Sequence, residues 1–247
     1  MHRFWVEAKL SAGAEASLDP AEARHAGQVL RLRPGDPCEL LGNGERWAGE
    51  IISLSADGGT VRVIAALPSA EPRLRITLFQ GLPKGDKMES IIQKAVELGA
   101  EAIIPVAMSR CVVRLDAKDA ARRRERWQRI AAEACKQSGR CALPEVKPFL
   151  TAKELPGAFR AFDAVLVPWE EAREGSLRTF AQKHPEVCRL AVVIGPEGGI
   201  TPEEIAEMEK AGAQTVTLGP RILRTETAGM AAVAALMSLY GEMEASA

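Results

Sequence analysis

The feature that most constrains the fold is a regular alternation of strand-like and helix-like segments that begins at residue 74. Short apolar runs of strand length occur at Leu74–Phe79, Ala102–Val106, Ala164–Pro168, Leu190–Ile194 and Gln214–Leu218. Helical spacing of apolar residues is found over residues 86–99, 116–138, 176–183, 202–211 and 226–240. Asp86 and Glu89 have the spacing of a capping box at the start of the first of these helices. Strands that alternate with helices predict an α/β domain with a mostly parallel sheet.

The first seventy residues have a different pattern, with short strands around one helix. Their expected elements are, in order, a helix from Asp19 to about Leu32, a turn over 33–36, and strands over 38–41, 47–54 and 60–66. Asn43-Gly44 is a typical hairpin turn between two of these strands. We therefore expect a small barrel-like β domain over residues 1–70, a linker at 67–72, and the α/β domain over residues 73–247.

Composition and cysteine usage narrow the class of protein. The chain is 47% hydrophobic and 26% charged, which is typical of a globular protein. Its five cysteines include no C-x-x-C pair, and no apolar leader follows Met1-His2-Arg3, so we expect a reduced, cytoplasmic location. The longest apolar stretch, Met230–Tyr240, is far shorter than the roughly 20 residues that span a bilayer. No His/Cys spacing resembles a metal site, so neither a membrane partner nor a metal is expected.

Charge is unevenly distributed along a chain whose formal net charge is only −1. Residues 71–150 carry 16 basic and 10 acidic side chains, whereas the segments before and after them are both net acidic. A basic block of this kind suits contact with phosphate groups, because each neutralised phosphate releases counterions. A solvated helix face explains the same pattern equally well.

A glycine-rich turn follows the expected strand Leu190–Ile194. It runs from Gly195 to Gly199, and a helix start follows in which Thr201 caps, Pro202 occupies the first turn and Glu204 completes a capping box. Such a turn lets a ligand approach the backbone closely and directs free N–H groups at a carboxylate or phosphate. It matches neither G-x-G-x-x-G nor a Walker loop. Taken alone, it is a tight turn more often than a ligand site.

A second turn follows the expected strand Gln214–Leu218 and begins with Gly219-Pro220. The helix after it is apolar nearly all round, which fits either core packing or a subunit interface. Ligands of open α/β sheets bind beyond the carboxyl ends of the strands, and both turns lie there. The pair of turns therefore predicts a ligand site.

Six motifs occur in an order that resembles a known family. They are Met1–Val6, His25-x3-Val29-Leu30-Arg31, Lys87–Gly99, Glu133–Arg140, Ile194–Gly199 and Leu218–Thr227. Together they resemble the RsmE family, the 16S ribosomal RNA uridine-N3 methyltransferases of the SPOUT class, across essentially the whole chain. The resemblance implies a PUA-like N-terminal domain, an α/β domain threaded into a trefoil knot, S-adenosylmethionine as cofactor, and a homodimer that acts on 16S rRNA of the small ribosomal subunit.

The resemblance also implies which residues hold the cofactor. Backbone groups would read adenine while apolar side chains enclose it. The residues carried over are Val167, Pro168, Ile194, Gly195, Glu197, Gly198, Gly199, Leu218, Gly219, Ile222, Leu223, Thr225 and Thr227.

Methylation of uracil N3 sets the chemical requirements for the remaining site residues. The imide proton must leave, and negative charge then spreads onto O2 and O4, so the reaction needs a proton acceptor and a cation or N–H donors. Glu197 is the candidate base or orienting group, although it could also cap its own turn or attract the sulfonium. Arg224 and Arg110 are candidate oxyanion stabilisers, and either could hold a phosphate instead.

Basic residues in both expected domains are candidate RNA contacts. They are Arg3, Arg24, His25, Arg31, Lys84, Lys87, Arg110, Arg114, Lys136 and Arg140. Arg24 and Arg31 are seven apart, so they share one face of the expected helix. His25 is more often a structural hydrogen-bonding residue, and the N-terminal arginines could be scattered surface charges. Two alternative functions remain: a non-catalytic ribosome-assembly or RNA-binding factor, and a ribose 2′-O-methyltransferase of the same fold.

Overall fold

The computed structural model describes residues 1–69 and 71–244 and divides the chain into two compact units. One unit contains Met1–Glu71 together with Cys135–Leu143, and the other contains Pro72–Ala134 together with the chain from Pro144 onward. The N-terminal unit therefore includes a segment from the middle of the sequence. Ala70, inside the expected linker, lies outside the described residues, as do residues 245–247 at the end of the expected second domain.

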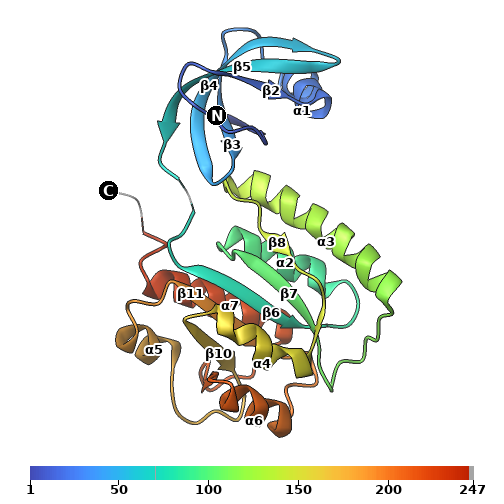
Figure 1. Ribbon diagram of the computed structural model, residues 1–247, viewed down its shortest axis with the longest axis vertical. Coiled ribbons are helices and arrows are strands. Elements are labelled where there is room, and N and C mark those ends of the chain that lie inside the picture. The colour runs from blue at the N-terminus through green and yellow to red at the C-terminus, as the bar shows by residue number, and fades with distance from the viewer. Residues whose placement is uncertain (70, 245–247) are drawn as a thin grey trace. The chain divides into compact units, whose positions relative to one another are not determined.

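The N-terminal unit is built on a five-stranded sheet with the order β1-β3-β4-β5-β2 (Figure 1). Its strands are β1 (His2–Trp5), β2 (Glu15–Leu18), β3 (Pro37–Gly42), β4 (Glu45–Ser55) and β5 (Gly58–Leu67). The predicted hairpin at Asn43-Gly44 is confirmed: both residues have positive φ, as a tight turn between β3 and β4 requires. Phe4, Leu40 and Ile51 are fully buried in the core of this unit.

The helix of this unit is shorter than the sequence predicted. α1 (Pro20–Arg24) begins with the Asp19 side chain accepting hydrogen bonds from the amides of Ala21 and Glu22, both at 2.8 Å. It then widens into the π-helical turn η1 (His25–Val29), in which the Leu30 amide donates to the His25 carbonyl. Arg31 has a φ of 58° and lies beyond the helix. The prediction that Arg24 and Arg31 share a helix face is therefore wrong.

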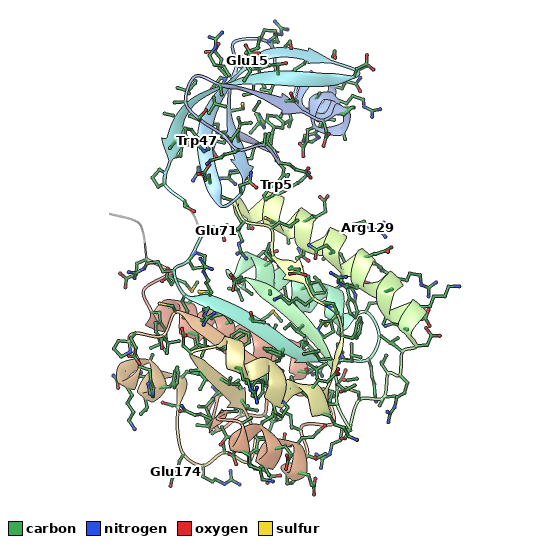
Figure 2. All side chains as sticks on the ribbon, viewed as in Figure 1. Trp5, Glu15, Trp47, Glu71, Arg129 and Glu174 are labelled. Atoms are coloured by element: carbon green, nitrogen blue, oxygen red, sulfur yellow. The ribbon has the colours of Figure 1, made fainter. Side chains whose placement is uncertain are left out.

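Glu71 anchors the segment Cys135–Leu143 within the same unit (Figure 2). One oxygen of Glu71 lies 2.7 Å from Nη2 of Arg140, and the other accepts the backbone amides of Cys141 and Ala142. Arg140 is only 6% exposed. A surface contact with RNA is incompatible with this burial, so the prediction for Arg140 is corrected: its guanidinium holds Glu71.

The α/β unit contains one parallel sheet with the order β12-β10-β11-β6-β7-β8, and β9 also pairs with β7. Its strands are β6 (Arg75–Gly81), β7 (Ala102–Ala107), β8 (Glu145–Val146), β9 (Leu150–Thr151), β10 (Ala164–Pro168), β11 (Arg189–Ile194) and β12 (Gln214–Val216). Every strand pairing in this sheet is parallel, which confirms the predicted α/β class. The two-residue strands β8 and β9 were not predicted.

Helices surround this sheet. They are α2 (Lys87–Glu97), α3 (Ala117–Ser138), α4 (Leu155–Ala158), α5 (Leu177–Lys183), α6 (Pro202–Lys210) and α7 (Thr225–Leu239), with short 3-10 turns η2 (Ala152–Glu154) and η3 (Phe159–Ala161). The predicted capping box at Asp86 does not form, because Glu89 donates its amide to the Asp86 carbonyl and not to the side chain. The box at Thr201 and Glu204 is confirmed.

The C-terminal helix α7 contacts α2, α5, β6 and β11 (Figure 1). Gly229 makes the close approach possible, since a Cβ there would lie 3.3 Å from Oε1 of Gln80 and 3.6 Å from Cδ2 of Leu78. The start of α7 is thereby held against the carboxyl ends of β6 and β11. Over the residues described, none of the helices combines the length and apolar character needed to cross a membrane.

Candidate active site

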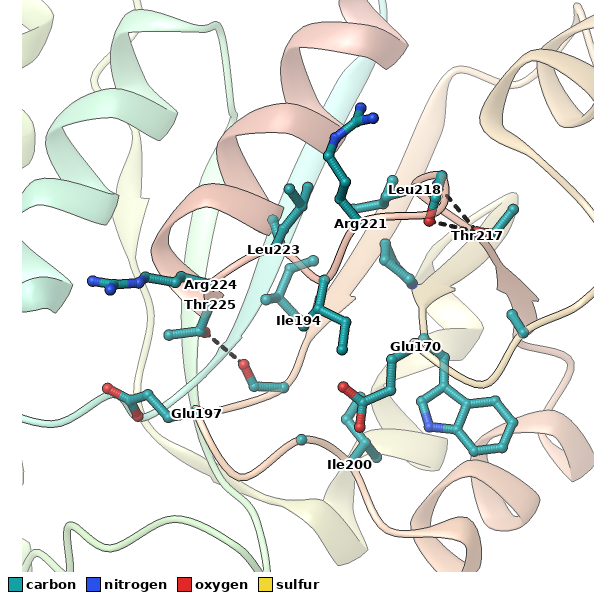
Figure 3. Close-up of a pocket in the computed structure, with 18 of the residues that line it drawn as sticks. Glu170, Ile194, Glu197, Ile200, Thr217, Leu218, Arg221, Leu223, Arg224 and Thr225 are labelled. Carbon is teal, nitrogen blue, oxygen red and sulfur yellow. Dashed lines mark hydrogen bonds between the residues drawn. The ribbon is translucent and has the colours of Figure 1, made fainter.

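A cavity of about 690 Å³ lies beyond the carboxyl ends of β10, β11 and β12 (Figure 3). Its lining comes from three segments that each follow one of these strands, within residues 168–173, 194–200 and 217–225, together with Lys87 and Ala228. This volume falls within the range of small-molecule sites. The two turns that the sequence singled out therefore meet at one pocket.

The 195–199 turn owes its shape to glycine. Gly199 has a φ of 73°, and its amide donates to the Pro196 carbonyl at 2.9 Å. A Cβ on Gly198 would lie 2.9 Å from Cβ of Arg110, whose Nη1 donates to the Gly198 carbonyl at 3.0 Å. Side chains at these positions would displace either the turn or its neighbours.

Glu204 fixes the end of the same turn from two directions. One of its carboxylate oxygens accepts a hydrogen bond from the Thr201 amide, and the other accepts hydrogen bonds from both the amide and the hydroxyl of Ser109. The capping box of α6 is thereby tied to the segment that follows β7. Ser109 was not identified from the sequence as part of the site.

A buried hydrogen-bond chain joins the 195–199 turn to the start of α7. The Thr225 hydroxyl donates to the Gly195 carbonyl at 2.6 Å (Figure 3). Nε2 of Gln80 donates to the Thr225 hydroxyl at 2.8 Å. Gln80 is completely buried at the end of β6. Gln80 is recognisable in the sequence only as a polar residue at the end of an otherwise apolar strand.

Glu197 is held by basic partners at the rim of the cavity. Its carboxylate accepts a hydrogen bond from Nζ of Lys87 at 2.9 Å and another from the backbone amide of Lys84 at 3.1 Å. Burial alone raises the pKa of Glu197, but the hydrogen bonds from Lys87 and from backbone amides outweigh it, so the net pKa lies below its usual 4.5. Nζ of Lys87 also lies 3.4 Å from Oε2 of Glu226. Lys87 thus links the 195–199 turn to the start of α7.

Most of the residues predicted to hold a cofactor lie in the cavity wall. They are Pro168, Ile194, Gly195, Glu197, Gly199, Leu218, Gly219, Ile222, Leu223 and Thr225, and the predicted Arg224 joins them. Val167, Gly198 and Thr227 lie outside the lining. Val167 is fully buried in β10, and Arg110 packs over Gly198.

The predicted RNA contacts fall into both units. Lys84, Arg110 and Arg114 are exposed in the α/β unit, whereas Arg3, Arg24, His25, Arg31 and Lys136 are exposed in the N-terminal unit. Two of them have acidic partners within the N-terminal unit: Arg3 lies 3.1 Å from the buried Glu39, and Lys136 pairs with Glu22. The predicted RNA contacts are therefore divided between the two units.

Sequence reasoning missed the part of the cavity wall that follows β10. Trp169, Glu170 and Arg173 line it, as do Thr217 and Arg221 beside the second turn. The rule that ligands bind beyond the carboxyl ends of parallel strands pointed to this segment as well, since it follows β10 directly.

Fold and site together define the class of protein. Residues 70–237, which include the parallel sheet and the pocket at its strand ends, match the family model of the RNA methyltransferase domain. Residues 18–64 match the family model of the RNA methyltransferase PUA domain. The fold, the pocket and the two matches therefore place the chain in the class of RNA methyltransferases that carry a PUA domain.

The relatives define the family within this class. The chain is 37% identical to the ribosomal RNA small subunit methyltransferase E of Bacillus subtilis (strain 168), over 96% of each chain. It is 36% identical to that of Mycobacterium tuberculosis (strain CDC 1551 / Oshkosh), over 99% of this chain and 94% of the relative. A crystal structure of the Neisseria gonorrhoeae enzyme bound to S-adenosyl methionine matches with a TM-score of 0.81 and 38% identity, over 97% and 98% of the two chains. The chain belongs to the ribosomal RNA small subunit methyltransferase E family, as the six motifs predicted.

Proposed function

We propose that this protein uses S-adenosylmethionine to methylate N3 of a uridine in 16S rRNA of the small ribosomal subunit. The observation that carries the proposal is the cavity formed by the segments after β10, β11 and β12, where most of the predicted cofactor residues meet. The names of the relatives support an rRNA substrate, and the S-adenosyl methionine bound to the Neisseria gonorrhoeae enzyme supports the cofactor.

The cavity fits this cofactor in size and in chemistry. Ile194, Leu218 and Leu223 supply apolar surface for an adenine ring, and the glycine turns leave backbone groups accessible. Bound S-adenosylmethionine would supply an activated methyl group on its sulfonium. Gly199 keeps the wall open, because a Cβ there would lie 3.2 Å from Oε1 of Glu170.

We assign Glu197 an orienting role and not that of the base. A lowered pKa makes a carboxylate a weak proton acceptor. The carboxylate of Glu197 also already accepts hydrogen bonds from the Lys84 amide and from Nζ of Lys87. Arg224 is exposed at the cavity wall, and its guanidinium makes no hydrogen bond or ion pair with the residues described. It is therefore the better candidate to stabilise negative charge on the uracil oxygens. Arg110 supports the 195–199 turn through the Gly198 carbonyl.

RNA recognition would use both units. The match to a PUA domain supports RNA contact by the N-terminal unit through Arg3, Arg24, His25, Arg31 and Lys136. Lys84 and Arg114 are exposed on the α/β unit and add positive charge there. An enzyme with this substrate works in the cytoplasm, where ribosomal subunits are assembled.

Two features of the family belong to the proposal: the trefoil knot in the C-terminal part of the α/β unit, and the homodimer. Support for the homodimer comes from α7, whose Met230, Ala231, Ala234 and Ala235 are only partly covered within one chain. Ile222 beside the cavity is 82% exposed, which is unusual for a large apolar side chain. A second copy would cover such surfaces.

The test is methylation of two RNA substrates. Purified protein and S-adenosylmethionine are incubated with unmodified small ribosomal subunits or with naked 16S rRNA, and digested nucleosides are identified by mass spectrometry. We expect 3-methyluridine from at least one substrate. A 2′-O-methylated nucleoside would identify a ribose methyltransferase instead, and the absence of both cofactor binding and methylation would identify a non-catalytic RNA-binding factor.

A further inference from the structure

Glu170 is an acidic residue in the cavity wall that no predicted role accounts for. It is the second residue after β10, and its carboxylate points into the cavity (Figure 3). Within the described chain it forms no hydrogen bond or ion pair, whereas the other carboxylate of the wall, Glu197, is held by Lys84 and Lys87. Glu170 is thus the carboxylate that remains available to a ligand.

The position of Glu170 along the cavity indicates which part of a ligand it meets. Thr217 and Leu218 lie on one side of it, and Glu197, Arg224 and Thr225 lie on the other (Figure 3). Its Oε1 is 3.2 Å from the place that a Cβ on Gly199 would occupy, so it faces the 195–199 turn. Glu170 therefore lies between the end of the cavity formed by Thr217 and Leu218 and the end with the candidate reaction groups.

The cofactor has a matching order of chemical groups. Its adenine is followed by a ribose and then by the sulfonium that carries the methyl group. With adenine at the end formed by Thr217 and Leu218 and the methyl group near Arg224, the ribose would lie in the middle of the cavity, beside Glu170. A ribose offers two neighbouring hydroxyl donors, and a carboxylate offers two acceptor oxygens in a charge-assisted arrangement.

We propose that Glu170 determines cofactor specificity by accepting hydrogen bonds from the ribose hydroxyls, an inference that rests on the proposed function. The same chemistry is used by dinucleotide-binding α/β domains, in which an acidic residue beside the glycine-rich turn binds ribose. Here β10 pairs directly with β11, the strand that leads into the 195–199 turn, so the acidic residue and the turn follow adjacent strands.

The experiment measures the affinity of four ligands for the purified protein by calorimetry. They are S-adenosylmethionine, S-adenosylhomocysteine, the 2′-deoxyribose form of S-adenosylhomocysteine, and 5′-methylthioadenosine, which keeps the ribose but lacks the sulfonium and the amino acid. Each is tested with the wild type, Glu170→Gln and Glu170→Ala. Glu171→Gln is the matched control, because Glu171 is an exposed glutamate next in the chain that does not line the cavity.

We expect Glu170→Ala to weaken all three ribose ligands roughly 10- to 100-fold, the range for a hydrogen bond to a charged group. The 2′-deoxy ligand, which keeps only the 3′-hydroxyl, should lose less affinity than its ribose counterpart, and Glu171→Gln should leave every affinity unchanged. Thermal unfolding of both Glu170 variants should match the wild type, since the side chain is exposed. Activity is not needed for this readout.

Two outcomes would overturn the assignment alone. Equal losses of affinity for the ribose and deoxyribose ligands would show that Glu170 does not bind the ribose hydroxyls. A loss seen with S-adenosylmethionine but not with 5′-methylthioadenosine would assign Glu170 to the positive charges of the cofactor instead. If the wild type bound none of these ligands, the proposed function would fail together with the assignment.

Discussion

At the scale of single residues, the charged groups around the cavity act first on the protein itself. Lys87 and the Lys84 amide both hold Glu197, and Lys87 also lies close to Glu226. The raised pKa of Lys87, due chiefly to its hydrogen bond with Glu197, keeps it positively charged across the physiological range. These residues orient the two turns, so their replacement should change cofactor binding as well as RNA binding.

Replacement of Glu197 by glutamine gives a prediction with a defined pH dependence. A carboxylate whose pKa is lowered in the folded state stabilises that state above its unfolded pKa of about 4.5, and this contribution is lost as the pH falls through the folded pKa. Glu197→Gln should therefore have a lower melting temperature than the wild type at pH 7, with the difference narrowing below pH ~4. Thermal unfolding at several pH values measures this, with the exposed Glu174→Gln as control.

Arg140 gives a second prediction at this scale. Removing one partner of a buried ion pair leaves the other charge uncompensated, which costs about 3–5 kcal/mol. Arg140→Met should therefore lower the free energy of unfolding by an amount in this range, because Glu71 would keep only its backbone donors. The exposed Arg129→Met is the control and should change it by less than about 0.5 kcal/mol. Equal effects in urea titrations would contradict the structural role of Arg140.

Part of the site was predictable from residue patterns, and part was not. Glycines, caps and family motifs identified Gly195, Gly199 and Thr225, because local turn geometry demands those residue types. Glu170 was missed, since nothing in its local sequence distinguishes it from the neighbouring Glu171. Arg140 was assigned to the surface because its partner Glu71 is far away in sequence.

At the scale of elements, the site depends on the bond chain that connects β6, the 195–199 turn and α7. Thr225→Val would remove the hydroxyl that donates to the Gly195 carbonyl and would leave Nε2 of Gln80 with only the Gly81 carbonyl as acceptor, at a cost of about 1–3 kcal/mol for an unsatisfied buried group. We expect lower stability and weaker binding of S-adenosylhomocysteine, measured by denaturation and calorimetry. Ser238→Ala, an exposed change on the same helix, should affect neither quantity.

The elements themselves were largely predictable, because burial on one or both faces imposes a period on the sequence. The strands β6, β7, β10 and β11 and the helices α3, α6 and α7 lie within a few residues of the expected ranges. The elements β2, β8 and β9 were missed because each is short and depends on a partner strand elsewhere. The π-helical turn η1 escaped detection because its residues also fit an ordinary helix.

At the scale of the whole molecule, the proposed homodimer gives a further prediction. Ala231 and Ala234 lie on the side of α7 away from its fully buried residues Ala232, Val233 and Leu236. A glutamate at either position would place a charge in an apolar interface, so Ala231→Glu and Ala234→Glu should convert a dimer into a monomer. Sedimentation velocity at micromolar concentration measures this. A monomeric wild type would contradict the proposed dimer.

The strand order of the α/β unit has a consequence for how the protein is made. β6 lies at the centre of the sheet, with Arg75 in register with Arg189 of β11, so one side of β6 has no partner until most of the chain exists. During synthesis the N-terminal end of a chain leaves the ribosome first, and pairing between strands distant in sequence is slow. The apolar strand β6 must therefore stay unpaired on that side while the nascent chain is still being translated. Completion of this sheet therefore comes late in the synthesis of the chain, and chaperone demand should be highest before that point.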